Sequence, residues 1–328
     1  MVKDFITNNK VNTASFESAL KLIDKAKYIL IVTHVNPDPD TICSGLALSN
    51  YLSENRIKHK VFNVGRNLPS NLDFINKFDK ITDQLPKYYD LLISVDCGSK
   101  NRLGIDVPDD VPFINFDHHK SNENFGTVNI VDINKSSTSE IIYDFFRFNG
   151  LYITKNTAEA MYVGIYDDSL AFTTPRCDEF TYEKINFLVK CGASPVYIAD
   201  KFIKRDSLAK YRILPKIFSS LELLDEGKIA TIYATKEWFD ESGASSLETE
   251  VCLSMVLNIA VVKVAIYFRI SNDKVRVSLR SKDDIDVSSV AAKFGGGGHL
   301  NAAGCVIQTE DVFEAKEIVL KEILEKKK

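Results

Sequence analysis

Short runs of apolar residues recur along the first part of the chain, and most of them show no alternation with polar residues. Segments with a helical spacing of apolar residues, such as 41–55 and 137–149, separate them. Strands that are apolar on both faces are typical of a parallel sheet that is covered on both sides. We therefore predict an α/β domain with a mainly parallel sheet, whose strands lie at 28–33, 60–64, 90–96, 111–117 and 128–132.

Helical patterning dominates from 157 to 224. Pro195 is expected to begin its last helix and Pro215 to bend or end it. A second, smaller α/β domain follows, with strands predicted at 228–235, 263–271, 274–281 and 302–309, a turn at Asn272-Asp273, and helices at 286–294 and 311–328. These patterns predict a first domain at 1–185, a helical linker at 186–215 and a second domain at 216–328.

Composition agrees with this organisation. The chain has 328 residues, enough for two domains that each bury a core, and is 45% hydrophobic and 26% charged. No apolar run could span a membrane, and the start "MVKDFITNNK" lacks the layout of an export signal, so we expect a cytoplasmic protein without a membrane contact. A net charge of −4 disfavours a grip on long duplex nucleic acid, but it leaves room for a short anionic substrate.

Histidines and aspartates follow the ends of three predicted strands. Functional groups of such sheets lie beyond the carboxyl ends of the strands, where they share one crevice. Taken alone, Asp38 or Asp40 could simply cap the helix that starts near Thr41. Three strand ends that deliver such residues to one edge favour a common site, whose members are His34, Asp38, Asp40, Asp96, Asp117, His118 and His119.

So many carboxylates in one crevice repel one another and raise their own pKa values unless cations neutralise them. Oxygen ligands mixed with imidazole suit a hard divalent ion such as manganese better than zinc, and no thiol is in the set. Two ions that share a bridging carboxylate activate a water between them for attack on phosphorus. The pattern therefore predicts a metal-dependent phosphohydrolase.

Four motifs in the first domain, "HVNPDPD", "VDCG", "DHH" and "GIYDDSLAF", occur in the order of the DHH phosphoesterase superfamily, and the chain resembles that family. "GGGGHLNAAG" together with "VSLRS" resembles the signature of its DHHA1 domain. The resemblance runs from about residue 28 to residue 307. The two-domain length is most similar to the nanoRNase and pAp-phosphatase branch.

The resemblance implies two manganese ions, with Asp96 as the bridging ligand. His119 would face the substrate phosphate, and Asp117 would orient a histidine. The implied metal ligands are His34, Asp38, Asp40, Asp96, His118 and Asp168. The chain departs from the family pattern at Pro39, Cys43, Asp167 and Leu170. Whether Asp167 joins the metal site stays open.

The glycine run at 294–304 could be a flexible link. Alternatively, its backbone N–H groups could form a nest for an anion, with a guanidinium beside it that grips phosphate. The resemblance implies the second role, in which the domain holds the far phosphate or nucleotide of the substrate. Arg102 is either a further phosphate contact or part of a structural salt bridge. The predicted substrate contacts are Arg102, Arg280, Ser281, Gly296, Gly297, Gly298, His299 and Asn301.

The expected activity is hydrolysis of very short single-stranded oligonucleotides to nucleoside 5′-monophosphates, dephosphorylation of 3′,5′-bisphosphoadenosine (pAp) to AMP, or both. Cleavage of cyclic di-AMP or of its linear product pApA is an alternative that the motifs do not separate. A non-catalytic nucleotide sensor is a second alternative, which the intact ligand set disfavours. The family resemblance is compatible with a homodimer.

Overall fold

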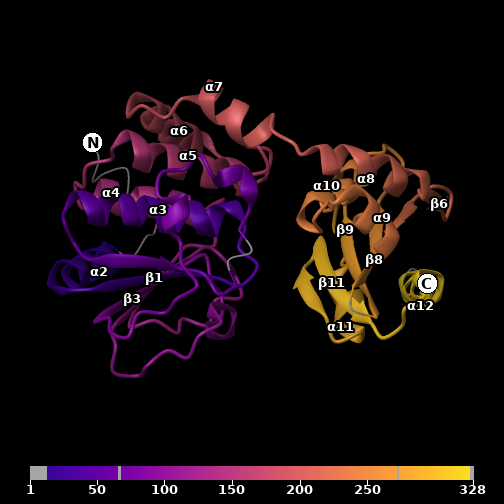
Figure 1. Cartoon of the computed structure of the whole chain (residues 1–328), viewed down its shortest axis with the longest axis horizontal. Helices are drawn as coiled ribbons and strands as arrows, with labels where there is room; N and C mark the ends of the chain where they lie inside the picture. The colour runs from indigo at the N-terminus through magenta and orange to yellow at the C-terminus, as the bar shows by residue number, and fades with distance from the viewer. Residues whose placement is uncertain (1–12, 66–67, 272, 326–328) are drawn as a thin grey trace. The chain divides into compact units, whose positions relative to one another are not determined.

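The computed structural model describes residues 13–65, 68–271 and 273–325. Its internal contacts divide the chain into two compact units, Met1–Arg205 and Asp206–Lys328, each with its own sheet (Figure 1). The division falls inside 186–215, where the sequence predicts a linker; the linker's role and bounds stay a prediction. Among the described helices, none is long and apolar enough to cross a membrane.

The sheet of the first unit confirms the predicted parallel arrangement. Its order is β2-β1-β3-β4-β5, and all four neighbouring pairs are parallel. Every residue of β1, β3 and β4 is buried, which explains why these strands read as apolar without alternation. The strands are β1 (Ile29–Thr33), β2 (His59–Phe62), β3 (Leu91–Val95), β4 (Phe113–Asp117) and β5 (Val128–Val131).

Helices cover one face of this sheet, where α3, α4 and α5 are stacked over β1 and β3 (Figure 1). The opposite face packs against Leu103 of the short turn η3 and against loop residues such as Val107 and Phe125 instead of an α-helix. The α-helices of the unit are α2 (Thr13–Lys25), α3 (Pro39–Glu54), α4 (Thr138–Phe148), α5 (Lys155–Asp168), α6 (Glu179–Lys190) and α7 (Pro195–Ile198). Short turns of other helix types lie at η1 (Ser70–Leu72), η2 (Phe78–Lys80), η3 (Lys100–Leu103) and η4 (Ala199–Ile203).

The helical stretch after Pro195 differs from the prediction. Pro195 starts α7 as expected, because a proline at the first position loses no helical hydrogen bond. The helix then widens into the π-type turn η4 and breaks at 204–207, and Ser207 caps a new helix, α8 (Leu208–Ser219). Pro215 lies inside α8 and does not end it, which corrects one of the two outcomes expected there.

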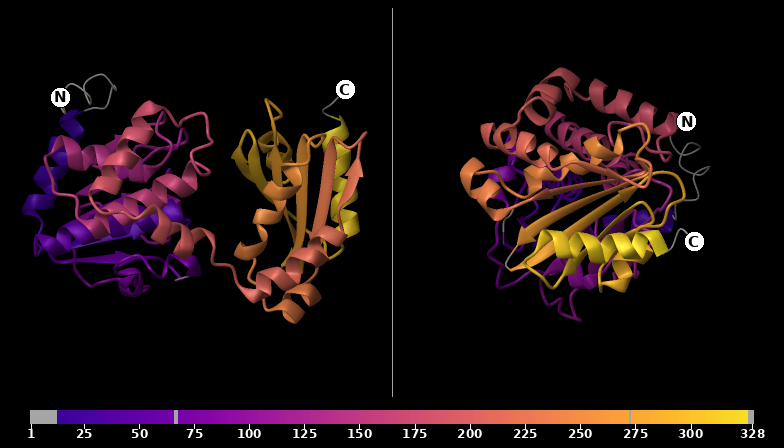
Figure 2. Two further views of the ribbon diagram at one scale, coloured as in Figure 1. Left: turned by 90° about the horizontal axis from the view of Figure 1, so that it is seen from above. Right: turned by 90° about the vertical axis from the view of Figure 1, so that its right-hand side faces the viewer.

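The second unit has a six-stranded sheet in the order β10-β11-β9-β8-β7-β6, parallel only between β7 and β8. One face packs on α11 and α12, the latter drawn in yellow in Figure 2, and the other face on α8, α9 and α10. The strands are β6 (Glu222–Leu224), β7 (Ile229–Ala234), β8 (Val264–Ser271), β9 (Lys274–Ser281), β10 (Gly297–His299) and β11 (Ala302–Ile307). The helices are α9 (Lys236–Ser242), η5 (Leu247–Thr249), α10 (Val251–Leu257), α11 (Ser288–Lys293) and α12 (Val312–Glu325).

The glycine run forms a strand, which neither sequence interpretation anticipated. Gly297 and Gly298 pair with Gly304 and Ala303 of β11. A Cβ on Gly296 would lie 2.1 Å from the carbonyl oxygen of Gly304, and one on Gly298 would lie 2.3 Å from that of Ala302. These two glycines are therefore required by the close approach of β10 to β11. Asn272 of the predicted turn lies outside the described residues, although β8 and β9 pair up to Ser271 and Lys274 on either side of it.

Candidate metal centre

The carboxyl ends of β1, β3 and β4 bring the predicted histidines and aspartates together. These strands are neighbours and run parallel, so the residues that follow them meet at one sheet edge. Asp96 lies at the middle of the group. Its Oδ2 is 3.4 Å from Nε2 of His34, and its Oδ1 is 3.4 Å from Nε2 of His118.

The N-terminus of α3 supplies two further carboxylates. Asp38 caps the helix by accepting a hydrogen bond from the backbone N–H of Thr41, while its Oδ2 lies 3.5 Å from Nε2 of His34. The side chain of Asp38 therefore caps α3 and also belongs to the candidate metal site. Asp40 is buried and accepts hydrogen bonds from the backbone N–H groups of Thr138 (2.7 Å) and Ser139 (3.0 Å), at the N-terminus of α4.

Helix α5 delivers Asp168 from its last turn. The Oδ2 of Asp168 lies 3.1 Å from Nε2 of His118. Gly164, one turn earlier, allows this approach, because a Cβ there would lie 2.0 Å from Oγ of Ser139 and 2.7 Å from Oδ1 of Asp40. The neighbouring Asp167 is outside the groups described next, but burial, together with Asp38 and Asp168, raises its pKa to about 8.

Ligand atoms of the described residues gather into three overlapping groups that could each hold a cation. His34, Asp38 and Asp96 form one group, and Asp40, His118 and Asp168 form the second. The third group, Asp96, His118 and His119, overlaps the second, and Asp96 also belongs to the first. Because the two oxygens of Asp96 face different groups, one carboxylate can contact two ions at once.

The histidine nitrogens fit a metal. Nδ1 of His34 lies 2.9 Å from the carbonyl oxygen of Val35, and Nδ1 of His118 lies 3.3 Å from that of Lys135. When each Nδ1 carries the proton and donates it to this carbonyl, Nε2 keeps a lone pair directed into the site. Among the described residues, no group forms a hydrogen bond with the buried Nε2 of His34, as expected of a nitrogen positioned to bind a cation.

The electrostatics also favour a cation. Burial and the nearby Asp96 raise the pKa of Asp40 to about 8, and burial and Asp40 raise the pKa of Asp168 to about 8. Burial would lower the pKa of His34, but Asp38 and Asp96 outweigh it and raise this pKa to about 10. The site carries more buried negative charge than its histidines balance, and divalent ions would supply the missing positive charge.

His119 and Asp117 form a contact pair beside the ligand groups. Nδ1 of His119 lies 2.7 Å from Oδ1 of the fully buried Asp117, whose other oxygen accepts a hydrogen bond from the amide of Asn122. Nδ1 of His119 is also 3.6 Å from Oδ1 of Asp96. Asp117 is thereby in the position expected of a residue that orients a histidine.

The sequence interpretation missed several features that surround these ligands. Asp96 itself has a left-handed backbone with φ 58°, and Leu170, Ala171 and Phe172, which follow the C-cap of α5, also have positive φ. Left-handed conformations are costly for non-glycine residues and concentrate at functional sites. Arg176, beyond this turn, places Nη1 of its guanidinium 3.5 Å from Nδ1 of His118. Its type and spacing matched no motif, so only the fold could bring it here.

Arg102 lies in η3, a few residues after Asp96. It makes no ion pair with any carboxylate among the described residues. The structural salt bridge considered for it is therefore absent from that part of the chain. Its carbonyl oxygen accepts a hydrogen bond from the N–H of Val35, which ties the loop after β3 to the loop after β1.

The predicted substrate contacts of the second unit gather at one end of its sheet. Arg280 of β9 pairs with Ala302 of β11. The amide nitrogen of Asn301 donates to Oγ of Ser281 (3.0 Å) and to the carbonyl oxygen of Asp283 (2.7 Å), and Ser281 Oγ donates to Ile285, so these polar groups already have partners within the unit. The side chain of His299 lies outside the part of the chain that the structure describes.

Comparisons with known proteins agree with this geometry. Residues 28–165 match the model of the DHH family, N-terminal domain, and residues 227–326 match the DHHA1 domain. The bifunctional oligoribonuclease and PAP phosphatase NrnA of Bacillus subtilis is 27% identical over 86% of this chain and 90% of its own. The cyclic-di-AMP phosphodiesterase PdeA of Listeria monocytogenes is 25% identical over 92% of this chain, but over only 48% of its own length. A crystal structure of an exopolyphosphatase-related protein from Bacteroides fragilis superposes with a TM-score of 0.87, at 26% identity and over 97% of both chains.

Proposed function

The chain belongs to the DHH phosphoesterase superfamily, and from this premise we propose that it hydrolyses very short oligonucleotides to nucleoside 5′-monophosphates and dephosphorylates pAp to AMP. The observation that carries the proposal is the position of Asp96, whose two oxygens face two separate groups of ligand atoms. Such a bridging carboxylate is a hallmark of two-metal phosphoryl chemistry.

We propose two divalent ions, most suitably manganese because the donors are carboxylate oxygens and imidazole nitrogens without thiols. His34, Asp38 and Asp96 would hold the first; Asp40, Asp96, His118 and Asp168 would hold the second. When bound, such ions lower the pKa of water and neutralise charge on phosphoryl oxygens.

The remaining polar groups would act on the substrate directly. Asp117 contacts Nδ1 of His119, which fixes the orientation of the ring, so that Nε2 would meet a phosphate oxygen. His119 would then stabilise the charge that develops on phosphorus or protonate the leaving oxygen. Arg102 and Arg176 would bind phosphate oxygens beside the metals, and Arg280 of the second unit would bind another phosphate of the substrate.

The test is digestion of end-labelled RNAs of about two to ten nucleotides, and of pAp, in buffer with and without Mn²⁺. We expect Mn²⁺-dependent release of nucleoside monophosphates from the shortest RNAs and of phosphate from pAp. Asp96→Asn, which keeps the shape of the side chain, should bind neither ion normally and show no turnover. A folded, Mn²⁺-loaded wild-type protein that cleaves none of these substrates would contradict the proposal.

Cyclic di-AMP or pApA is the alternative substrate, favoured by the similarity to PdeA over most of this chain. The two proposals predict different relative turnover rates for these substrates. Faster turnover of cyclic di-AMP than of pAp and dinucleotide RNA, on one preparation, would favour the alternative. Full binding of nucleotide with no turnover of any substrate would indicate a sensor instead.

A further inference from the structure

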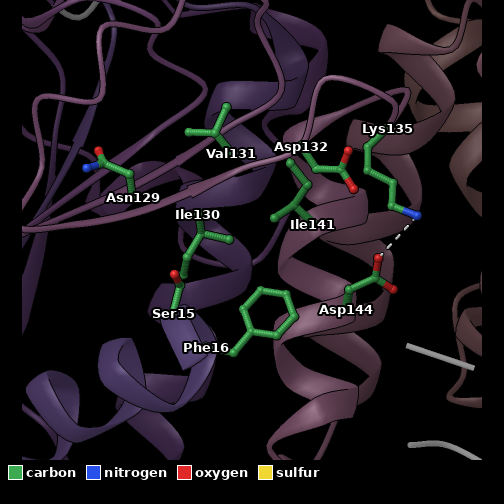
Figure 3. Close-up of a pocket in the computed structure, with 9 residues that line it drawn as sticks. All are labelled: Ser15, Phe16, Asn129, Ile130, Val131, Asp132, Lys135, Ile141 and Asp144. Carbon is green, nitrogen blue, oxygen red and sulfur yellow. Dashed lines mark ion pairs between the residues drawn. The ribbon is translucent and has the colours of Figure 1, made fainter. Parts of the chain in front are cut away.

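Beneath the N-terminus of α4 lies a cluster of two lysines and two carboxylates, all buried. Nζ of Lys184 is 2.8 Å from Oε1 of Glu140 and 2.8 Å from Oδ2 of Asp144. Nζ of Lys135 is 3.8 Å and 3.6 Å from the same two oxygens, and Figure 3 shows its pair with Asp144. Lys184 comes from α6, a helix that contributes none of the metal ligands proposed above.

The two lysines are not equivalent. Lys135 and Asp144 line a cavity of about 40 Å³ beside Phe16 (Figure 3), which is large enough for water. The side chain of Lys184 is only 1% exposed and makes the shorter contacts. Burial lowers the pKa of a lysine, but Asp144 and Glu140 outweigh burial and raise the pKa of Lys184 above its usual range. Lys184 is therefore a firmly charged group that holds Glu140.

Glu140 connects Lys184 to the segment that precedes α4 through hydrogen bonds. Its Oε2 accepts hydrogen bonds from the backbone N–H (3.1 Å) and the Oγ (2.8 Å) of Ser136. The residues on either side of Ser136 contact the proposed metal ligands. The carbonyl oxygen of Lys135 faces Nδ1 of His118 at 3.3 Å, and the N–H and Oγ1 of Thr138 donate to Asp40 (2.7 Å) and Asp96 (3.0 Å).

The cluster is difficult to explain as a source of stability alone. Four buried charges cost much desolvation, and buried ion pairs are often replaceable by apolar residues without a loss of stability. In some proteins such buried ionic groups instead fix one geometry. Here the segment they fix, residues 135–138, contacts three proposed ligands from both proposed groups.

We propose that Lys184 is a positioning residue of the metal centre, which acts through Glu140 and Ser136 on the segment that orients His118, Asp40 and Asp96. The proposal rests on the metal centre of the proposed function. It goes beyond the ligand set, because it assigns a role to an ion-pair cluster that contacts neither metal nor substrate. Substitution of residues that orient metal ligands without contacting the metal typically lowers metal affinity or activity by about 10–100-fold.

The test compares Mn²⁺ affinity, measured by calorimetry, in the full-length wild type, Lys184→Met and Leu188→Ala. Leu188 is fully buried on the same helix, so Leu188→Ala matches the loss of stability without touching the ion pairs. We expect Lys184→Met to bind Mn²⁺ at least about 10-fold more weakly, with a lower kcat at saturating Mn²⁺. Leu188→Ala should bind Mn²⁺ like the wild type.

Charge balance gives a compensating variant. Lys184→Met leaves two carboxylates with only Lys135, and adding Asp144→Asn restores one cation for one anion. Lys135 can then pair with Glu140 alone, so the double variant should recover most of the lost Mn²⁺ affinity. Recovery is expected of an electrostatic positioning role but not of a simple packing defect; failure to recover would contradict it.

Ser136→Ala keeps the test decisive if Lys184→Met does not fold. It removes one hydrogen bond to Glu140 and leaves all four charges in place, so we expect about 3–10-fold weaker Mn²⁺ binding. Wild-type affinity in either folded variant would overturn the positioning role. Absence of Mn²⁺ binding by the wild type would instead contradict the metal centre itself, and with it this proposal.

Discussion

Removal of metal should make the protein unusually sensitive to rising pH. In the metal-free protein, Asp38 and Asp96 outweigh the effect of burial and raise the pKa of His34 to about 10, and Asp96 does the same for His118. A group with a raised pKa contributes stability that is fully present below its unfolded pKa and is lost as the pH rises through its folded pKa. The histidine contribution is therefore lost between about pH 6.5 and pH 10.

Asp40 acts in the same direction. Burial and Asp96 raise its pKa to about 8, so the folded protein holds a proton that the unfolded chain releases above about pH 4. Its contribution also falls as the pH rises, up to about pH 8. Asp96, whose pKa is held well below its usual range by His118 and His34 against the effect of burial, contributes no change in this window.

The magnitude follows from these shifts. Between pH 6.5 and 8, His34, His118 and Asp40 each lose about 2 kcal/mol, since one pH unit is worth about 1.4 kcal/mol. Asp167 and Asp168, whose pKa values burial also raises to about 8, act in the same direction. The groups interact with the same charges and titrate together, so we expect a total of about 3 kcal/mol. For a unit of this size the midpoint of thermal unfolding should fall by about 10 °C.

Thermal unfolding in chelator and in saturating Mn²⁺, at about pH 6.5 and 8, measures this effect. The metal-free midpoint should fall with pH, whereas Mn²⁺ should raise the midpoint more at pH 8, where fewer protons compete for the ligands. Asp168→Asn is the matched variant. It should melt no lower than the wild type without metal at pH 8, yet gain less from Mn²⁺. A metal-free midpoint that stays constant or rises with pH would refute the reasoning.

Three further predictions concern single residues. Arg176→Ala should raise the KM for pAp by about 10-fold with little effect on Mn²⁺ affinity, because it would lose a charged hydrogen bond to phosphate; steady-state kinetics and calorimetry separate the two, and an unchanged KM would remove Arg176 from the site. Gly164→Ala should weaken Mn²⁺ binding, because its Cβ would displace Ser139 and Asp40; normal binding would show that α5 can shift freely. Gly297→Ala should leave the unfolding midpoint unchanged, since its Cβ meets nothing within 4 Å, but should weaken nucleotide binding if β10 faces the substrate; unaltered binding would contradict that role.

The strands of the first unit were predictable because burial on both faces leaves a direct trace in the sequence. Each predicted strand differs from the observed one by two residues or fewer at either end, and the parallel order explains why residues distant in sequence meet at Asp96. His34, Asp96 and His118 could be grouped from this rule alone.

Features that depend on contacts between segments distant in the chain could not be predicted from the sequence pattern. The glycine run was read as a link or an anion nest, yet close contact with β11 makes Gly297–His299 a strand. Arg176 and Lys184 belong to no motif, and their places depend on how the turn after α5 and helix α6 pack. Helix propensity alone also could not show that 204–207 interrupts the helical stretch after Pro195.

Metal stoichiometry, measured by titration with Mn²⁺ and followed by electron paramagnetic resonance, tests the shared role of Asp96 most directly. We expect two ions per chain with the exchange coupling of a bridged pair, and loss of that coupling in Asp96→Asn. Asparagine tolerates the left-handed backbone of position 96, so the fold should persist in that variant. A single ion per chain, or an unchanged coupled signal in Asp96→Asn, would contradict the account.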